Sequence, residues 1–185
     1  MDSPRPISGL LLAWTAEWSP FAELADRIGA AARSYPFAVA ALHDYSRAYR
    51  KNLNSHADGI TAITILKLLD HLRNSTGLEA STDVDDLFDL IPAVRLAARA
   101  DLERPEDHAG AHATLAELIL VSGDQASADD RAAALFHYRE AGRSATVREI
   151  LIARLHLFAG LGFRPALVSD ALRVLESLPQ SAPSL

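Results

Sequence analysis

Apolar residues recur at intervals of three and four along most of the chain, which is the spacing of one face of an α-helix. Three such faces are formed by Leu115, Leu118, Ile119 and Leu120, by Ile150, Leu151, Leu155 and Phe158, and by Leu167, Leu172, Leu175 and Leu178. Only residues 59–66, rich in β-branched side chains, compete as a strand. Helical spacing continues from them, and a lone strand has nothing to pair with, so the pattern predicts one helix over about 58–74.

Prolines, capping residues and glycines divide this pattern into segments. Proline is tolerated in the first turn of a helix, and it precedes four predicted helices, at Pro20, Pro36, Pro105 and Pro165. Oxygen-bearing side chains suited to N-caps begin others, at Thr82, Ser127 and Ser144 or Thr146. Glycines suited to helix ends follow, at Gly77, Gly123, Gly142 and Gly160. Pro92 is expected to kink or divide the helix that contains it.

The sequence therefore predicts an all-α protein of about eight or nine helices, each of roughly 10–17 residues. Residues 1–178 form a single helical domain in this interpretation, and residues 179–185 form a flexible tail. The architecture is either an irregular helical bundle or a short α-solenoid.

Composition removes several classes of function. The 185 residues carry a net charge of −6, and the acidic excess lies in residues 81–185, which argues against a nucleic-acid partner. There is no cysteine, so disulfides and thiolate chemistry are excluded. No apolar run approaches the length of a membrane span, and the N-terminal segment lacks a clear cleavage site. We expect a cytoplasmic protein, and the many alanines and arginines suggest a GC-rich bacterial source.

A partial internal repeat occupies the second half of the chain. One helix has a large–small–large pattern ending in glycine, and the next has small residues on either side of an aromatic ring: Leu115, Ala116, Ile119 and Gly123, then Ala134, Tyr138 and Ala141. A weaker copy follows at Leu155, Ala159, Ala171, Leu175 and Leu178. Small residues let two helix axes approach, and the aromatic ring fills the space beside them.

This pattern resembles the tetratricopeptide-like (TPR-like) helical repeats over about residues 112–178. The resemblance implies a solenoid of antiparallel helix pairs that binds a peptide of another protein. The sequence departs from the family in three respects. Its turn over residues 123–131 is about six residues too long, the closing proline is absent, and His112 occupies the position usually held by tryptophan.

Asp85, Asp86 and Asp89 match the D-D-x-x-D pattern with which isoprenoid synthases hold magnesium. A second metal-binding cluster and basic residues for a diphosphate are not evident, and the chain is short for such an enzyme. Acidic residues after Thr82 also suit the first turn of a helix, where the helix dipole favours negative charge. We interpret the motif as helix capping.

Histidines give two further hypotheses of metal binding. His108 and His112 are four apart, so a helix would aim both imidazoles the same way, but a third ligand must come from another helix. His43-Asp44 matches the dipeptide of metal-dependent HD phosphohydrolases, but the upstream histidine that this family requires is absent. No catalytic residue, metal ligand or cofactor is predicted.

Seven residues are candidate partner-binding positions: Trp14, Trp18, Tyr45, Arg47, Tyr49, Arg50 and Lys51. The tyrosines and basic residues would dock an acidic peptide or a phosphate, and the tryptophans would form a dimer or partner face. The alternative is ordinary helices whose aromatic rings pack inward and whose charges face solvent.

We expect from these patterns a non-catalytic protein–protein interaction module, such as an adaptor, chaperone or regulatory subunit. Its partner would be a peptide or helix of another protein in a groove between helices, and homodimerisation is a further possibility. The alternative is a small-molecule sensor with a cavity lined by residues such as Phe136, Leu155 and Phe158. A metal-dependent enzyme is the least favoured hypothesis.

Overall fold

A computed structural model describes residues 24–76, 89–123 and 127–179, and within these ranges the regular structure is helical. The helices are α2 (Leu24–Lys51), α3 (His56–Thr76), α4 (Ile91–Asp101), α5 (His108–Ser122), α6 (Ala128–Ala141), α7 (Ala145–Gly160) and α8 (Pro165–Glu176). No strand occurs in these ranges, which confirms the all-α prediction.

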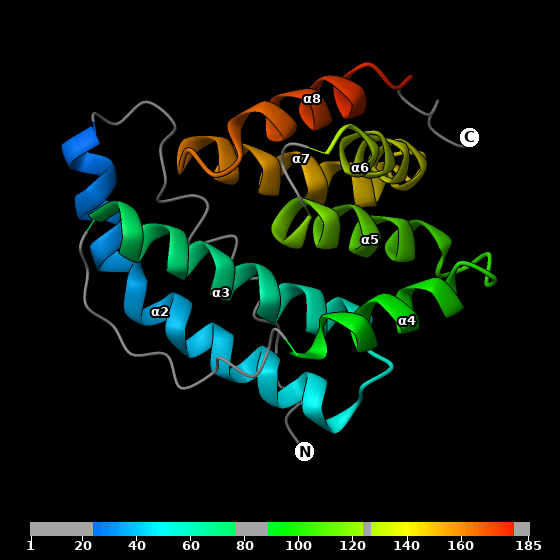
Figure 1. Ribbon diagram of the computed structural model, residues 1–185, viewed down its shortest axis with the longest axis horizontal. Helices are drawn as coiled ribbons and strands as arrows, with labels where there is room; N and C mark the ends of the chain where they lie inside the picture. The colour runs from blue at the N-terminus through cyan, green and yellow to red at the C-terminus, as the bar shows by residue number, and fades with distance from the viewer. Residues whose placement is uncertain (1–23, 77–88, 124–126, 180–185) are drawn as a thin grey trace.

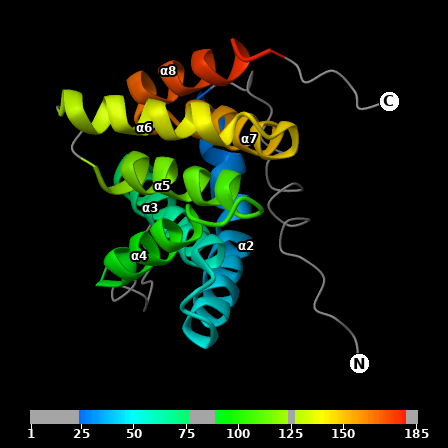
Figure 2. The ribbon, with the colours of Figure 1, turned by 90° about the vertical axis from the view of Figure 1, so that its right-hand side faces the viewer.

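The helices are stacked in layers (Figure 1). Helix α3 lies between α2 and α5, and α4 packs against both α3 and α5. Helix α6 lies between α5 and α8, as the view turned by 90° shows (Figure 2), while α7 packs on α8 and α5. Buried apolar residues of all seven described helices form one continuous core.

Helix α2 corrects one prediction. The sequence predicted a new helix at Pro36, but α2 runs through this residue as a single helix of 28 residues. A proline inside a helix removes one backbone hydrogen bond and costs about 3 kcal/mol. The C-terminal half of α2 buries Leu42 and Tyr49 against the core, and that burial offsets the local cost.

Other local signals are confirmed, apart from the capping bond expected of Ser144. Helix α3 spans His56–Thr76, close to the predicted 58–74. Helix α4 begins at Ile91 with Pro92 in its first turn, so the proline marks a helix start. Ser127 caps α6 by accepting a hydrogen bond from the Asp130 amide at 3.1 Å. Ser144 is the N-cap residue of α7 but makes no side-chain capping bond.

Small residues let helices approach closely at two places in the fold. Ala116 of α5 and Ala134 and Ala141 of α6 are fully buried, as is Tyr138 of α6, and these two helices pack on each other. Gly59 of α3 faces both α2 and α4: a Cβ added there would lie 2.5 Å from Val94 Cγ2 and 2.9 Å from Tyr49 Cε2. Such distances are shorter than van der Waals contact, so this three-helix crossing requires glycine.

Alanine substitutions at two helical glycines are expected to have opposite effects. Gly59→Ala should destabilise the protein by about 1–3 kcal/mol, because the methyl group overpacks the crossing. Gly110→Ala, in the first turn of α5, should stabilise it by about 0.5–1 kcal/mol, because nothing lies within 4 Å of the new Cβ. Urea unfolding followed by circular dichroism measures both. Equal effects of the two substitutions would contradict the close approach at Gly59.

Candidate functional site

Of the seven predicted partner-binding residues, the structure describes the two tyrosines, which are buried or half-buried, and the three basic residues, which are exposed. Tyr49 is fully buried, so the prediction that its ring contacts a partner is wrong: its helical position turns it toward α3 and α4. Tyr45 is half-buried. Arg47, Arg50 and Lys51 are exposed at the end of α2. Trp14 and Trp18 lie outside the described residues.

The aspartate motif is described only in part. Asp85 and Asp86 lie outside the described ranges, as does the proposed cap Thr82. Asp89 is exposed in a short 3₁₀ turn that leads into α4. His43 and Asp44 are likewise exposed, on the outer side of α2.

Three histidines meet where α5 packs on α6. The Nδ1 atoms of His112 and His137 lie 2.7 Å apart, so one ring donates a hydrogen bond to the other. The His108 ring packs edge-on against His112 with centroids 4.5 Å apart, and Phe136 packs against both His112 and His137. A third histidine, His137 of α6, thus joins the predicted pair of His108 and His112 on α5.

This cluster favours neutral imidazoles. Burial, together with the nearby His112 and Arg99, lowers the pKa of His137 to about 4. Burial and His108 also lower the pKa of His112, and Glu140 acts in the opposite direction. A hydrogen bond between two Nδ1 atoms needs one protonated and one bare nitrogen, so the pair tolerates one cation but not two. Across the described part of the chain, no three potential ligands are placed to hold a metal ion.

Acidification is expected to destabilise the α5–α6 packing through His137. Its pKa is about 4 in the folded chain and near 6.5 when unfolded, so its contribution to stability is present above pH 6.5 and lost on descending to pH 4. The ring is only partly buried, and after allowing for solvent screening we expect a loss of about 1–2 kcal/mol.

The measurement compares unfolding free energies at pH 7 and pH 4 for the natural chain and for His137→Asn. The variant removes this titration but leaves the carboxylates whose protonation also destabilises proteins in acid. A smaller pH dependence in the variant is the expected result, and identical dependence in both proteins would contradict it.

A second polar network joins α3, α4 and α5. His56 Nδ1 lies 2.7 Å from Thr114 Oγ1, and His56 Nε2 lies 3.4 Å from the Asp101 carboxylate. Burial lowers the pKa of His56, while Asp101 opposes this shift. The order hydroxyl, imidazole, carboxylate is that of a hydrolytic triad. Thr114 is only 3% exposed, however, so its hydroxyl faces the helix interface and the network holds three helices together.

An ion pair crosses the interior between α5 and α7. Glu117 is 1% exposed, and its two carboxylate oxygens each accept a hydrogen bond of 2.9 Å from Nη1 of Arg154. The carboxylate raises the pKa of Arg154. Tyr138 lies nearby, and its pKa is raised well above the usual value by burial and by the charge of Glu117. This group fixes the position of α7 on α5.

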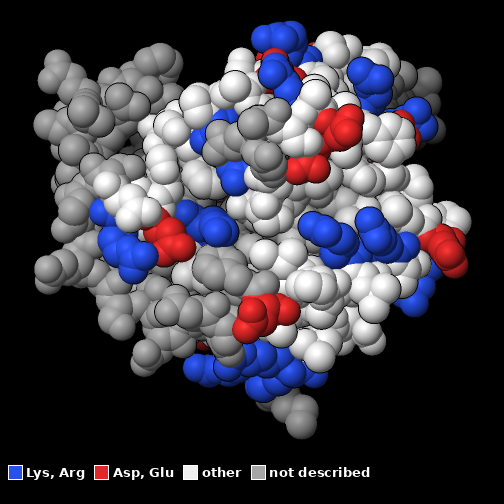
Figure 3. Space-filling view, in the orientation of Figure 1, with Lys and Arg blue, Asp and Glu red and all other residues white. Residues whose placement is uncertain are grey.

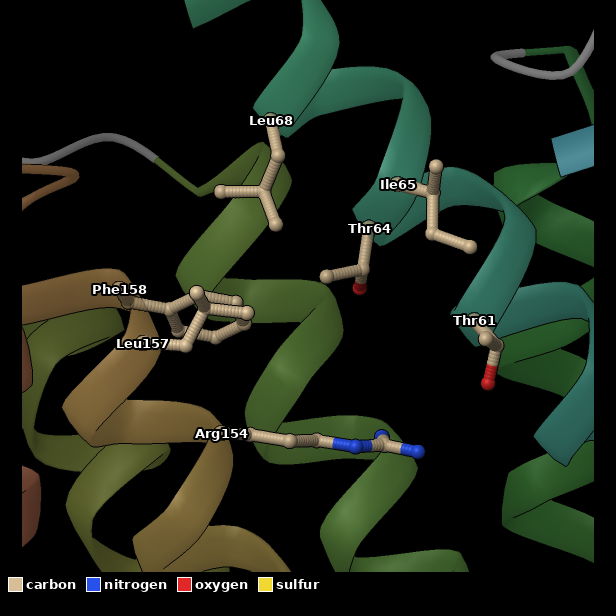
Figure 4. Close-up of a pocket in the computed structure, with 7 residues that line it drawn as sticks. All are labelled: Thr61, Thr64, Ile65, Leu68, Arg154, Leu157 and Phe158. Atoms are coloured by element: carbon tan, nitrogen blue, oxygen red, sulfur yellow. The ribbon is translucent and has the colours of Figure 1, made fainter. Parts of the chain in front are cut away.

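A small pocket lies between α3 and α7 (Figure 4). Arg154 extends from α7 toward α3, below Thr64 and beside Thr61, and the remaining lining is apolar. The cavity volume is about 10 Å³, close to what one water molecule needs. Phe158 contributes to this lining, but Phe136 is 54% exposed, which corrects its predicted place in an apolar cavity.

Two large apolar side chains are exposed on α4 and α6, the helices that pack on either side of α5. Leu96 of α4 is 71% exposed and Phe136 of α6 is 54% exposed. Arg95 and Arg99 flank Leu96 on α4, and Arg99 lies close enough to His137 to lower its pKa. We call the surface formed by Arg95, Leu96, Arg99, Phe136 and His137 the α4–α6 face.

Comparison with known proteins gives no relative: no protein-family model, no curated protein and no solved structure matches this chain. Among the described helices, none combines the length and apolar character needed to cross a bilayer.

Four residues of these networks were missed from the sequence: His56, Glu117, His137 and Arg154. Glu117 and Arg154 did leave a signal, because each is a single charge inside an apolar helical run, "LAELILV" and "ILIARLHLF". Two lone charges of opposite sign on buried helices are expected to pair. His56 and His137 have no comparable local signal.

Proposed function

We propose that this protein is a non-catalytic interaction module that binds a peptide or helix of another protein. The observation that carries the proposal is the α4–α6 face, where the exposed side chains of Leu96 and Phe136 adjoin arginines and imidazoles. Exposed aromatic and aliphatic side chains beside arginine are enriched in protein interfaces. An adaptor, a chaperone or a regulatory subunit would each use such a surface.

The packing order of the last four helices supports a short TPR-like array. Helix α5 pairs with α6, and α7 pairs with α8. Each member of the first pair also packs on its counterpart in the second, α5 on α7 and α6 on α8. Stacked helical repeats make these contacts, and they present a continuous surface to a partner. The buried Ala116, Ala134 and Ala141 occupy the small-residue positions that such pairs need.

Site-specific photo-crosslinking in the native host tests the proposal. A photoreactive phenylalanine analogue is placed at Phe136 on the α4–α6 face, at Arg47 on the end of α2, and at Ile150 as an exposed control on α7. We expect a discrete crosslinked protein, identified by mass spectrometry, from position 136 and from neither 47 nor 150. The same background at all three positions would count against an interaction module.

A further inference from the structure

The α4–α6 face carries two arginines that pair with no acidic side chain of the described residues. Arg95 and Arg99 are exposed and four residues apart, so they project from the same side of α4. Neither forms an ion pair with any described residue. Other arginines do have carboxylate partners: Arg73 with Asp70, Arg104 with Asp101, Arg131 with Asp170, Arg143 with Glu140, Arg154 with Glu117 and Arg173 with Asp170.

Apolar surface adjoins these charges on both helices. Leu96 lies between the two arginines in sequence, and its side chain is among the most exposed of the large apolar residues described. Burial, His112 and Arg99 together lower the pKa of His137 on α6, and the His137 ring is 5.3 Å from Phe136. Figure 3 shows basic side chains side by side over α4 on the visible face. The face thus combines cationic groups of α4 with exposed apolar groups of α4 and α6, the two helices that pack on α5.

Charge complementarity determines which partner suits this surface. The chain as a whole carries a net charge of −6, so a phosphate-rich nucleic acid is repelled by most of its surface. A short acidic segment of a protein avoids that repulsion, because it contacts the arginines locally. Guanidinium groups bind carboxylates through paired hydrogen bonds, and exposed apolar side chains gain by leaving water.

We propose that the α4–α6 face binds an acidic amphipathic helix of a partner protein. Carboxylates of the partner pair with Arg95 and Arg99, and its large apolar side chains pack on Leu96 and on Phe136. This inference rests on the proposed interaction function and names the surface and the chemistry of its partner.

The end of α2 offers a matched comparison. Arg47 and Lys51 have the same spacing of four residues and are exposed, as is Leu53. Lys51 lies in the last turn of α2, where the carbonyl end of the helix attracts cations, and the nearby Tyr49 ring is buried. Equal charge reversals at the two sites therefore separate a local effect of the α4–α6 face from a change in net charge.

The experiment selects binders to the full chain from a phage-displayed library of random helical peptides of about 16 residues. Selected peptides are then synthesised, and their affinities are measured by fluorescence anisotropy against Arg95→Glu/Arg99→Glu, Phe136→Ala and the control Arg47→Glu/Lys51→Glu. Circular dichroism verifies that each variant is folded. A labelled 20-nucleotide single-stranded DNA serves as the nucleic-acid probe.

We expect the selected peptides to be rich in Asp and Glu with one or two large apolar residues. Their binding should weaken by about tenfold or more in Arg95→Glu/Arg99→Glu and in Phe136→Ala, and change by less than about twofold in the α2 control. Peptides that bind but are insensitive to the α4 reversal would overturn this inference and leave the proposed function intact. Selection of no peptide would contradict both. DNA binding that is lost on the α4 reversal would assign the face to nucleic acid instead.

Discussion

Replacing Arg154 with methionine is expected to lower the free energy of unfolding by about 3–5 kcal/mol. The substitution leaves the Glu117 carboxylate of α5 buried in the protein interior without the guanidinium that donates to both of its oxygens. A buried charge whose partner has been removed loses both its solvation and its compensating attraction. Urea unfolding monitored by circular dichroism gives the difference.

Two further variants identify the cause of this loss. In Glu117→Leu/Arg154→Met both charges are removed, and we expect most of the lost stability to return, because apolar side chains of similar size fill the same space. Arg143→Met removes an ion pair at the protein surface, where Arg143 is 72% exposed, and should cost no more than about 1 kcal/mol. If Arg154→Met costs no more than Arg143→Met, the buried pair is not a major contribution to stability.

The pair also bears on the proposed architecture. Glu117 and Arg154 occupy the contact between α5 and α7, the first helices of the two proposed repeats. A buried ionic contact at such a position fixes one register between neighbouring helix pairs, whereas apolar contacts tolerate sliding. The double variant therefore gains a second readout, because a change in the α5–α7 register would alter the near-ultraviolet circular dichroism spectrum of the neighbouring Tyr138.

Local sequence signals predicted the elements whose cause is local. The α3 helix follows from apolar residues at helical spacing, and the start of α6 follows from an oxygen of Ser127 that satisfies a free amide. The same kind of rule failed at Pro36, because the local penalty of a helical proline is smaller than the burial that α2 gains along α3. Propensity decides an element only where packing does not.

The candidate site depends on non-local packing, which is why only half of it could be predicted from the sequence. The i, i+4 spacing identified His108 and His112, but the His137 ring is 25 residues further along and meets them only through the α5–α6 register. Arg95, Leu96 and Phe136 are ordinary residues in sequence. Their exposure, and the lack of an ion pair between Arg95 and any residue that the structure describes, are properties of the folded surface that periodicity does not reveal.

Tyr49→Ala is expected to destabilise the protein by about 3–5 kcal/mol, the usual cost of removing a fully buried aromatic ring. The ring fills the crossing of α2 with α3, beside the position where Gly59 allows close approach. Its hydroxyl is buried without a hydrogen-bond partner in the described chain, so Tyr49→Phe should be neutral or slightly stabilising. Thermal and urea unfolding distinguish the two substitutions.

The same variants, together with Arg47→Ala, test whether Tyr49 packs in the core or belongs to a docking surface at the end of α2. Arg47→Ala removes an exposed charge two residues away and should change the free energy of unfolding by less than about 0.5 kcal/mol. A large loss in Tyr49→Ala with none in Tyr49→Phe or Arg47→Ala places the ring, and not its hydroxyl or its charged neighbours, in the helix packing. If Tyr49→Ala is as stable as the natural chain, the burial of Tyr49 is contradicted. The hypothesis that this segment is an aromatic docking site would then be supported.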